Sequence, residues 1–436
     1  MQNVASTPAP TRDAISRYVR TTFASLRLRN YRLYFIGQGV SLVGTWMQGI
    51  AQAWLVLTLT NSGVALGFVM AAQFLPVLFL APYGGVLADR FPKRRILLVS
   101  QSCAAVLALV LAALVYTGTV RLWMVFVLAA GLGIVNAIDN PTRQSFVHEL
   151  VGAKDLRNAV TLNSLEVNLA RVIGPAFAGA LIAGIGLSMC FAVNGLSFIA
   201  VLVCLALMRS SDLHKTALVE PAKGQLREGL AYALHTPIIR NALIMMTLVG
   251  MLTYEFPVTL GMLSKFTFNA TAGSYALLTS AVGVGAVLGG LATAGRRRAA
   301  LRGLTIASFG FGVTMFLAAV SPTLAFAALA MVAVGAFSIA FTSLTNTILQ
   351  LEAEPQMRGR VMSLWAVAFL GSTPIGAPIV GWIGMHFSPR VSIAVGGAAA
   401  VIAGIVGLWA MRTNRRAAET VCIAEQPAVA EKEDFA

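Results

Sequence analysis

Long runs of apolar residues that carry almost no charge dominate this sequence of 436 residues. Residues 97–115 contain no charged side chain, and residues 301–350 contain a single one, Arg302. Charged residues make up 11% of the chain, whereas about 25% is usual in a soluble domain. Because an apolar run of about 20 residues spans the hydrocarbon core of a bilayer as a helix, the sequence predicts an all-α integral membrane protein.

The apolar runs predict twelve transmembrane helices in two six-helix halves. We expect these helices at residues 33–59, 62–87, 94–117, 122–146, 159–184, 188–208, 241–262, 272–294, 302–320, 322–350, 361–384 and 390–411.

The longest internal polar stretch, residues 209–240, lies between the two groups of helices. Apolar side chains recur in it at helical spacing, which predicts a short amphipathic helix on the membrane surface. These side chains are Leu226, Leu230, Ala233 and Leu234. The chain then divides into a cytoplasmic N-terminal segment (1–32), an N-terminal six-helix half (33–208), a cytoplasmic linker (209–240), a C-terminal six-helix half (241–412) and a cytoplasmic disordered tail (413–436).

The distribution of positive charge predicts the orientation of the helices. With a cytoplasmic N-terminus, roughly 28 of the 32 Lys and Arg residues fall on the cytoplasmic side. Arg121, Lys265 and Arg390 fall outside, and Arg171 lies well inside a span. The net charge of +15 therefore indicates a multi-pass protein with both termini in the cytoplasm, and it does not indicate nucleic-acid binding. The first 30 residues also lack the apolar core of a cleavable signal.

A glycine, an acid and a basic cluster follow the second predicted helix, in the sequence Gly84-Gly85-Val86-Leu87-Ala88-Asp89-Arg90-Phe91-Pro92-Lys93-Arg94-Arg95. Gly85 permits two helices to approach closely, and the basic cluster stays in the cytoplasm. An Asp at this boundary, Asp89, can face the positive N-terminal end of a neighbouring helix.

This segment resembles the loop motif of the major facilitator superfamily, with Pro92 in place of the motif's second Gly. The resemblance implies that Asp89 caps the N-terminus of span 11, and that a basic residue, here Lys93, pairs with an acid at the end of span 4, here Asp139. These contacts would lock the outward-open state. We therefore expect a conformational latch composed of Gly85, Asp89, Arg90, Lys93, Asp139 and Arg143.

A weak repeat and three further segments extend the resemblance. Short similar segments of the two halves recur at an offset of about 205 to 211 residues, as in the parallel repeat of major facilitators. The segments 44–48, 139–144 and 358–361 resemble the subgroup that includes the bacterial enterobactin exporter and related drug exporters. The resemblance implies a bacterial cytoplasmic (inner) membrane protein, a binding site between the halves and a monomer.

One face of the first span carries polar side chains at steps of three and four residues. They are Gln38, Ser41, Thr45, Gln48 and Gln52. Such a face is costly against lipid, so it faces either other helices, through hydrogen bonds, or a wet cavity. Gln38, Thr45 and Gln48, together with Trp46 of the subgroup segment, are candidates for a substrate cavity.

Charged residues at membrane depth are costly and are usually functional. Arg171 in span 5 either binds an anionic group of a substrate or pairs with an acid on another helix. Glu255 in span 7 is the first candidate for a proton-coupling site and Glu166 is the second, although each could instead form a structural ion pair. Asp139 and Arg143 are spaced for an intrahelical pair, or for a pair that switches partners during transport.

Gly174 and Pro175 follow Arg171 on the same helix and resemble part of the antiporter motif of span 5. They form either a hinge or a kink that serves packing.

Several functions are excluded by what the sequence lacks. It has no phosphate-binding loop and no nucleophile elbow, and its four His and four Cys show no metal-ligand spacing. We therefore predict no enzyme, no metal and no cofactor. The prediction is a secondary active transporter in membrane lipid, which exchanges protons for amphipathic small molecules, either drugs or a siderophore-like metabolite. The alternatives are an importer or facilitator of a small nutrient and a non-transporting membrane sensor or scaffold.

Overall fold

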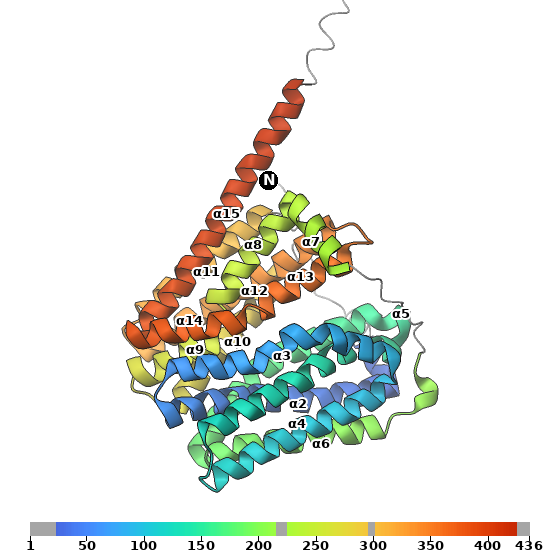
Figure 1. Cartoon of the computed structure of the whole chain (residues 1–436), viewed down its shortest axis with the longest axis vertical. Helices are drawn as coiled ribbons and strands as arrows, with labels where there is room; N and C mark the ends of the chain where they lie inside the picture. The colour runs from blue at the N-terminus through green and yellow to red at the C-terminus, as the bar shows by residue number, and fades with distance from the viewer. Residues whose placement is uncertain (1–22, 215–224, 295–300, 425–436) are drawn as a thin grey trace, which may run out of the picture.

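The computed structural model describes residues 23–214, 225–294 and 301–424, and every regular element in them is helical (Figure 1). The N-terminal half consists of a short 3₁₀ turn, η1 (Ala24–Arg27), and helices α2 (Arg29–Thr60), α3 (Gly63–Arg90), α4 (Lys93–Tyr116), α5 (Leu122–Gly184) and α6 (Leu187–Ala206). A second 3₁₀ turn, η2 (Ser210–Asp212), follows α6.

The C-terminal half is preceded by a short helix, α7 (Gln225–His235). Its helices are α8 (Pro237–Leu252), α9 (Phe256–Met262), η3 (Leu263–Thr267), α10 (Ala272–Ala294), α11 (Leu301–Ala319), α12 (Leu324–Glu352), α13 (Arg358–Leu370), α14 (Thr373–His386) and α15 (Pro389–Ala424).

The helices account for twelve membrane passes in two halves. In the described residues, eleven helical stretches are long and apolar enough to cross a membrane. One of them, α5, has 63 residues, more than twice the length of one pass, and it turns at Gly152, whose φ of 67° lies in the left-handed region. The fourth and fifth spans, predicted apart at 122–146 and 159–184, are therefore joined by continuous helix on both sides of this glycine.

Two predicted spans are broken in the middle. Span 7, expected at 241–262, ends as α8 at Leu252 and resumes as α9 at Phe256, and span 11 is divided between α13 and α14 in the same way. A proline lies in the first turn of both α9 and α14, where its missing N–H costs no helical hydrogen bond. The prediction of continuous helices here was wrong.

The final helix is longer than expected. Helix α15 continues to Ala424, so residues 413–424 of the tail predicted to be disordered are helical. The N-terminal residues 1–22, residues 215–224 of the linker and the tail residues 425–436, for which the sequence also made predictions, lie outside the described residues.

The two halves meet at the end that lies away from the basic loops (Figure 1). There α3 packs on α14 and α5 packs on α10. A Cβ at Gly67 would clash with the backbone of Ala377, and one at Gly179 would lie 3.0 Å from Cβ of Ala276, so small residues permit this close contact. Toward the end with the basic loops, where α7 and the start of α13 lie, the halves diverge.

The short helix α7 is attached to the segment that leads into α13. Glu228 forms an ion pair with Arg360 at 2.8 Å, and the backbone N–H of Glu354 donates to the Tyr232 hydroxyl at 3.2 Å. Ala233, one of the apolar residues of the predicted stripe, is buried, whereas Leu230 and Leu234 are exposed. The linker helix is thus held at the end of the C-terminal half where the two halves diverge.

Candidate functional site

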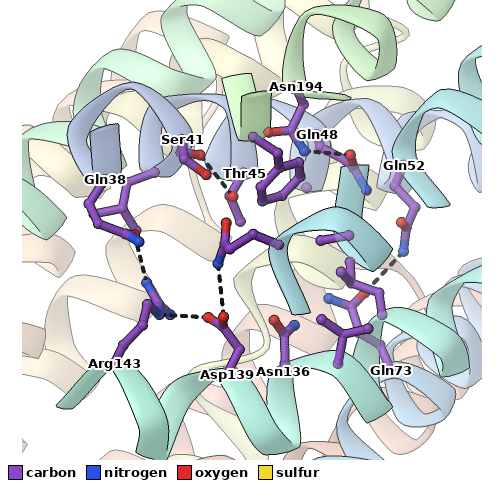
Figure 2. Close-up of a pocket in the computed structure, with 17 residues that line it drawn as sticks. Gln38, Ser41, Thr45, Gln48, Gln52, Gln73, Asn136, Asp139, Arg143 and Asn194 are labelled. Carbon is purple, nitrogen blue, oxygen red and sulfur yellow. Dashed lines mark hydrogen bonds and ion pairs between the residues drawn. The ribbon is translucent and has the colours of Figure 1, made fainter. Parts of the chain in front are cut away.

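The polar face of α2 lines a cavity inside the N-terminal half (Figure 2). The cavity has a volume of about 90 Å³. Beside the five polar residues of α2, its polar lining consists of Gln73, Gln101, Asn136, Asp139, Arg143 and Asn194, from α3, α4, α5 and α6. The polar face therefore serves the interior of one half, and the cavity has room for a few water molecules rather than for an amphipathic substrate.

Hydrogen bonds across this cavity satisfy much of its polarity. Asn194 donates to Oε1 of Gln48 at 2.6 Å, and Gln52 donates to Oε1 of Gln73 at 3.1 Å. Nε2 of Gln38 and Oε1 of Gln101 are buried without a protein partner. Of the cavity candidates, Gln38 and Gln48 are therefore buried inside the N-terminal half, whereas Thr45 is exposed. The sequence could not reveal this, because spacing along one helix does not specify its neighbours.

Asp139 lies at the centre of a complete set of polar contacts. Its Oδ1 accepts from Ser100 at 2.7 Å and from Gln101 at 2.8 Å, and its Oδ2 lies 2.7 Å from Nε of Arg143. Arg143 also donates to Asn140 at 2.6 Å. The intrahelical pair that the sequence suggested is present (Figure 2). Because this buried carboxylate is fully partnered, it stabilises the N-terminal half.

The basic residue of the loop motif has a different partner from the one expected. Nζ of Lys93 lies 2.7 Å from Oε1 of Glu149, beyond Asp139 on α5. The expected pair of Lys93 with Asp139 is thus absent from this conformation. Reasoning from the sequence missed Glu149 because the fourth span was expected to end at 146, whereas the helix continues past it.

The rest of the expected latch is open. Asp89 and Arg90 are exposed, and Asp89 makes no hydrogen bond or ion pair with any described residue. The close helix approach expected at Gly85 occurs at its neighbour: a Cβ on Gly84 would clash with the backbone of Ala137, whereas Gly85 faces open space. The undocked Asp89 matches the divergence of the halves at this end.

Arg171 lies on α5 where this helix meets the C-terminal half. Its guanidinium carbon is 5.1 Å from the ring centroid of Trp46, and its Nε is buried without a hydrogen-bond partner. The next residue, Val172, accepts a hydrogen bond from Ser280 of α10 at 3.2 Å. Arg171 forms no ion pair with any described residue, so the structural pair considered from the sequence is absent there.

Glu255 occupies the break between α8 and α9 and is 2% exposed. Its side chain lies near Thr373, the first residue of α14, and its Oε1 has no hydrogen-bond partner. A Cβ on Gly376 would clash with the backbone of Met251, so the two broken spans lie directly against each other. No cation pairs with this carboxylate among the described residues.

Glu166 is buried against α2 and does not line the cavity. It is 6% exposed, and neither carboxylate oxygen has a hydrogen-bond partner. A Cβ on Gly39 would lie 2.7 Å from its Oε1, which places the carboxylate against α2. Arg143 is the cation that acts on it electrostatically, without forming an ion pair. Glu166 therefore forms no pair with Arg171, the other ionisable residue of span 5.

The expected hinge is a packing contact in this conformation. A Cβ on Gly174 would lie 2.5 Å from Cβ of Trp46, and α5 stays helical through Pro175. Gly174 therefore permits Trp46 to reach Arg171.

A family model of the major facilitator superfamily, described as transmembrane secretion effector, matches residues 20–434. The chain belongs to this family. This major facilitator protein is a multi-pass membrane transporter that takes a small-molecule substrate, and it is not an enzyme.

Known relatives of this facilitator include siderophore transporters. It is 24% identical to "Enterobactin exporter EntS" of Salmonella typhimurium over 408 residues, which cover 89% of this chain and 94% of the relative. It is 31% identical to "Staphyloferrin A transporter" of Staphylococcus aureus over 178 residues, which cover 40% of this chain and 45% of that relative.

Solved structures share the fold of this facilitator. The crystal structure of a bacterial homolog to the human lysosomal transporter Spinster, inward-facing and unoccupied, superposes with a TM-score of 0.70 at 16% identity, over 90% of this chain and 97% of that chain. A bacterial homologue of the iron transporter ferroportin, also inward-facing, gives a TM-score of 0.67 at 16% identity, over 88% and 98%. At these identities the likeness shows the fold alone.

Proposed function

We propose that this facilitator is a proton-coupled exporter of amphipathic small molecules in the bacterial cytoplasmic membrane, with both termini in the cytoplasm. The distribution of basic residues supports this orientation, because the loops that carry them lie at one end of the helices. The names of two relatives, an enterobactin exporter and a staphyloferrin A transporter, support a siderophore-like metabolite as the cargo.

The observation that carries the proposal is Glu255. A charged carboxylate that is 2% exposed and has no cationic partner among the described residues is costly, and protonation removes that cost. The carboxylate lies in a helix break, near Thr373 of a second broken helix. Proton uptake and release at Glu255 therefore act on the two helices best placed to change shape.

The latch residues supply the other part of the cycle. Here Asp89 is exposed and the halves diverge at the end with the basic loops, which the proposed orientation makes the cytoplasmic end. Substrate then enters from the cytoplasm or the inner leaflet. Closure of that end brings Asp89 to the N-terminus of α13, where the helix dipole favours a carboxylate, and the opposite end separates.

The test is proton flux in proteoliposomes that contain the parent or Glu255→Gln, while dyes, antibiotics and siderophores are added one at a time. We expect at least one compound to release protons with the parent and none with Glu255→Gln. Glu352→Gln, at an exposed position of α12, is the matched control and should behave like the parent. Equal proton release by Glu255→Gln would remove Glu255 from the coupling step and direct the same test to Glu166.

A further inference from the structure

We propose that Arg171, Trp46 and an aromatic row of the C-terminal half form a binding site for anionic amphipaths that carry an aromatic ring. The inference rests on the proposed function, because it assigns the class of cargo to a site between the halves. It concerns Arg171, which is neither a latch residue nor a partner of the proposed coupling carboxylate, Glu255.

The first observation is a cation with no counter-ion. Arg171 makes no ion pair with any described residue, and its buried Nε has no hydrogen-bond partner. The carboxylate of α5 that precedes Arg171 most closely in sequence, Glu166, lies against Gly39 on a different face of the helix. The Arg171 side chain is half-buried, so a guanidinium without an anion carries a desolvation cost that an incoming anion relieves.

The second observation is the aromatic surface on both sides of this cation. Trp46 of α2 stacks on the guanidinium, with 5.1 Å between the guanidinium carbon and the ring centroid, and Tyr254, between α8 and α9, lies within electrostatic range of Arg171. Tyr254 packs edge-on against Phe369, with 5.1 Å between the ring centroids, and the ring centroids of Phe369 and Trp365 are 5.5 Å apart. The aromatic row Tyr254, Phe369 and Trp365 thus continues from Arg171 into the C-terminal half.

The site contains N–H groups that have no hydrogen-bond acceptor. The Tyr254 hydroxyl is already engaged, since it donates to the Ser338 carbonyl at 2.6 Å and lies 2.9 Å from the Thr342 hydroxyl. Nε1 of Trp365 is buried and has no partner. Arg171 and Trp365 therefore offer N–H donors from the two halves, and the rings between them offer apolar surface.

These groups select for anionic rather than cationic molecules. A guanidinium binds a carboxylate or another planar oxyanion through two parallel hydrogen bonds, and it repels a cationic dye. Indole and phenyl rings bind the aromatic part of the same molecule by stacking or edge contacts. The buried carboxylate of the C-terminal half, Glu255, lies in the helix break near Thr373 and is not part of this row.

The test is equilibrium binding to the purified full chain in detergent, with radiolabelled 2,3-dihydroxybenzoate as the anionic aromatic probe and ethidium as the cationic one. We expect Arg171→Gln to weaken binding of 2,3-dihydroxybenzoate by tenfold or more and to leave ethidium binding unchanged or stronger. Arg171→Lys should weaken binding of the anionic probe by less than Arg171→Gln does, because Lys keeps the positive charge. Some loss is still expected, since Lys lacks the planar guanidinium that forms two parallel hydrogen bonds. Arg121→Gln, at an exposed position outside the site, is the control.

The outcomes separate this inference from the proposed function. If the parent and Arg171→Gln both elute as folded protein and bind 2,3-dihydroxybenzoate equally, the proposed binding site at Arg171 is wrong. Selective loss of this binding, together with no proton flux for any compound, supports the site and counts against export. Displacement of the probe by phosphatidylglycerol in mixed micelles, but not by unlabelled aromatic carboxylates, would assign Arg171 to an anionic lipid headgroup and overturn the cargo assignment.

Discussion

Two buried regions of this transporter hold charge in opposite ways. In the N-terminal half, the Asp139 carboxylate has three partners, Ser100, Gln101 and Arg143, all within 2.8 Å. Where the halves meet, and in the broken helices, Arg171 and Glu255 have no ion pair with a described residue. The difference favours a structural role for Asp139 within one half, and it is the basis of our proposal that Arg171 and Glu255 bind a substrate anion and a proton only during part of the transport cycle.

The largest expected effect is on stability at the partnered site. Asp139→Ala leaves the Arg143 guanidinium without its counter-ion and removes the acceptor of Ser100 and Gln101. We expect a loss of about 3 kcal/mol or more, because breaking a buried pair leaves an uncompensated charge. Thermal unfolding of the detergent-solubilised protein measures it, and an unchanged midpoint would contradict the contrast between the regions.

A smaller loss is expected at the loop motif. Glu149→Gln removes the charged partner of Lys93 in a pair whose side chains are 16% and 10% exposed. The expected cost is about 1–2 kcal/mol, since Gln retains a hydrogen bond to the ammonium group. The same unfolding assay reports it, and substrate transport should fall as well. Full transport by a stable Glu149→Gln variant would remove this pair from the latch.

Substitutions at the two sites without ion-pair partners should not destabilise the protein, in contrast to those at Asp139 and Glu149. Arg171→Leu removes a half-buried charge and Glu255→Gln a buried one, and neither charge has an ion pair with a described residue. The free energy of unfolding should therefore stay the same or rise, by no more than about 1 kcal/mol. Transport should nevertheless be lost in both. If either variant unfolded as easily as Asp139→Ala, the charge it removes would be structural and the comparison would fail.

The smallest effect is expected at the linker helix. Glu228, whose side chain is 57% exposed, pairs with Arg360 in contact with solvent. Glu228→Gln should change stability by less than about 0.5 kcal/mol, as exposed ion pairs usually do. Raising the salt concentration should change the parent's unfolding midpoint no more than it changes that of the variant. A larger loss would mean that α7 is part of the framework.

The sequence was sufficient to predict the helical spans, because hydropathy and length decide them. Helix α10, expected at 272–294, is found at those residues, and the other helices differ chiefly at their ends and at the two breaks. The breaks were missed because a proline near Glu255 or after Gly371 can lie inside a helix or in its first turn. Only the surrounding packing decides between these positions.

The partners of the candidate residues were harder to predict than the residues themselves. Helical spacing placed Gln38, Thr45 and Gln48 on one face of α2, but it contains no information on which helices cover that face. The same limit applies to Lys93, whose partner Glu149 lies 56 positions away in sequence, and to Arg171, whose proximity to Tyr254 joins the two halves.

The contact between the two broken spans has a mechanical consequence. The breaks in spans 7 and 11 lie side by side in the C-terminal half, where the Glu255 side chain is near Thr373. Gly376 permits the backbones of the two spans to touch there. The six spans of the N-terminal half have no such pair of interruptions in the described residues, since the turn at Gly152 lies between two of its passes. We therefore expect the N-terminal half to tilt as a rigid body while the C-terminal half bends at the two helix breaks. The two halves would then move asymmetrically during transport.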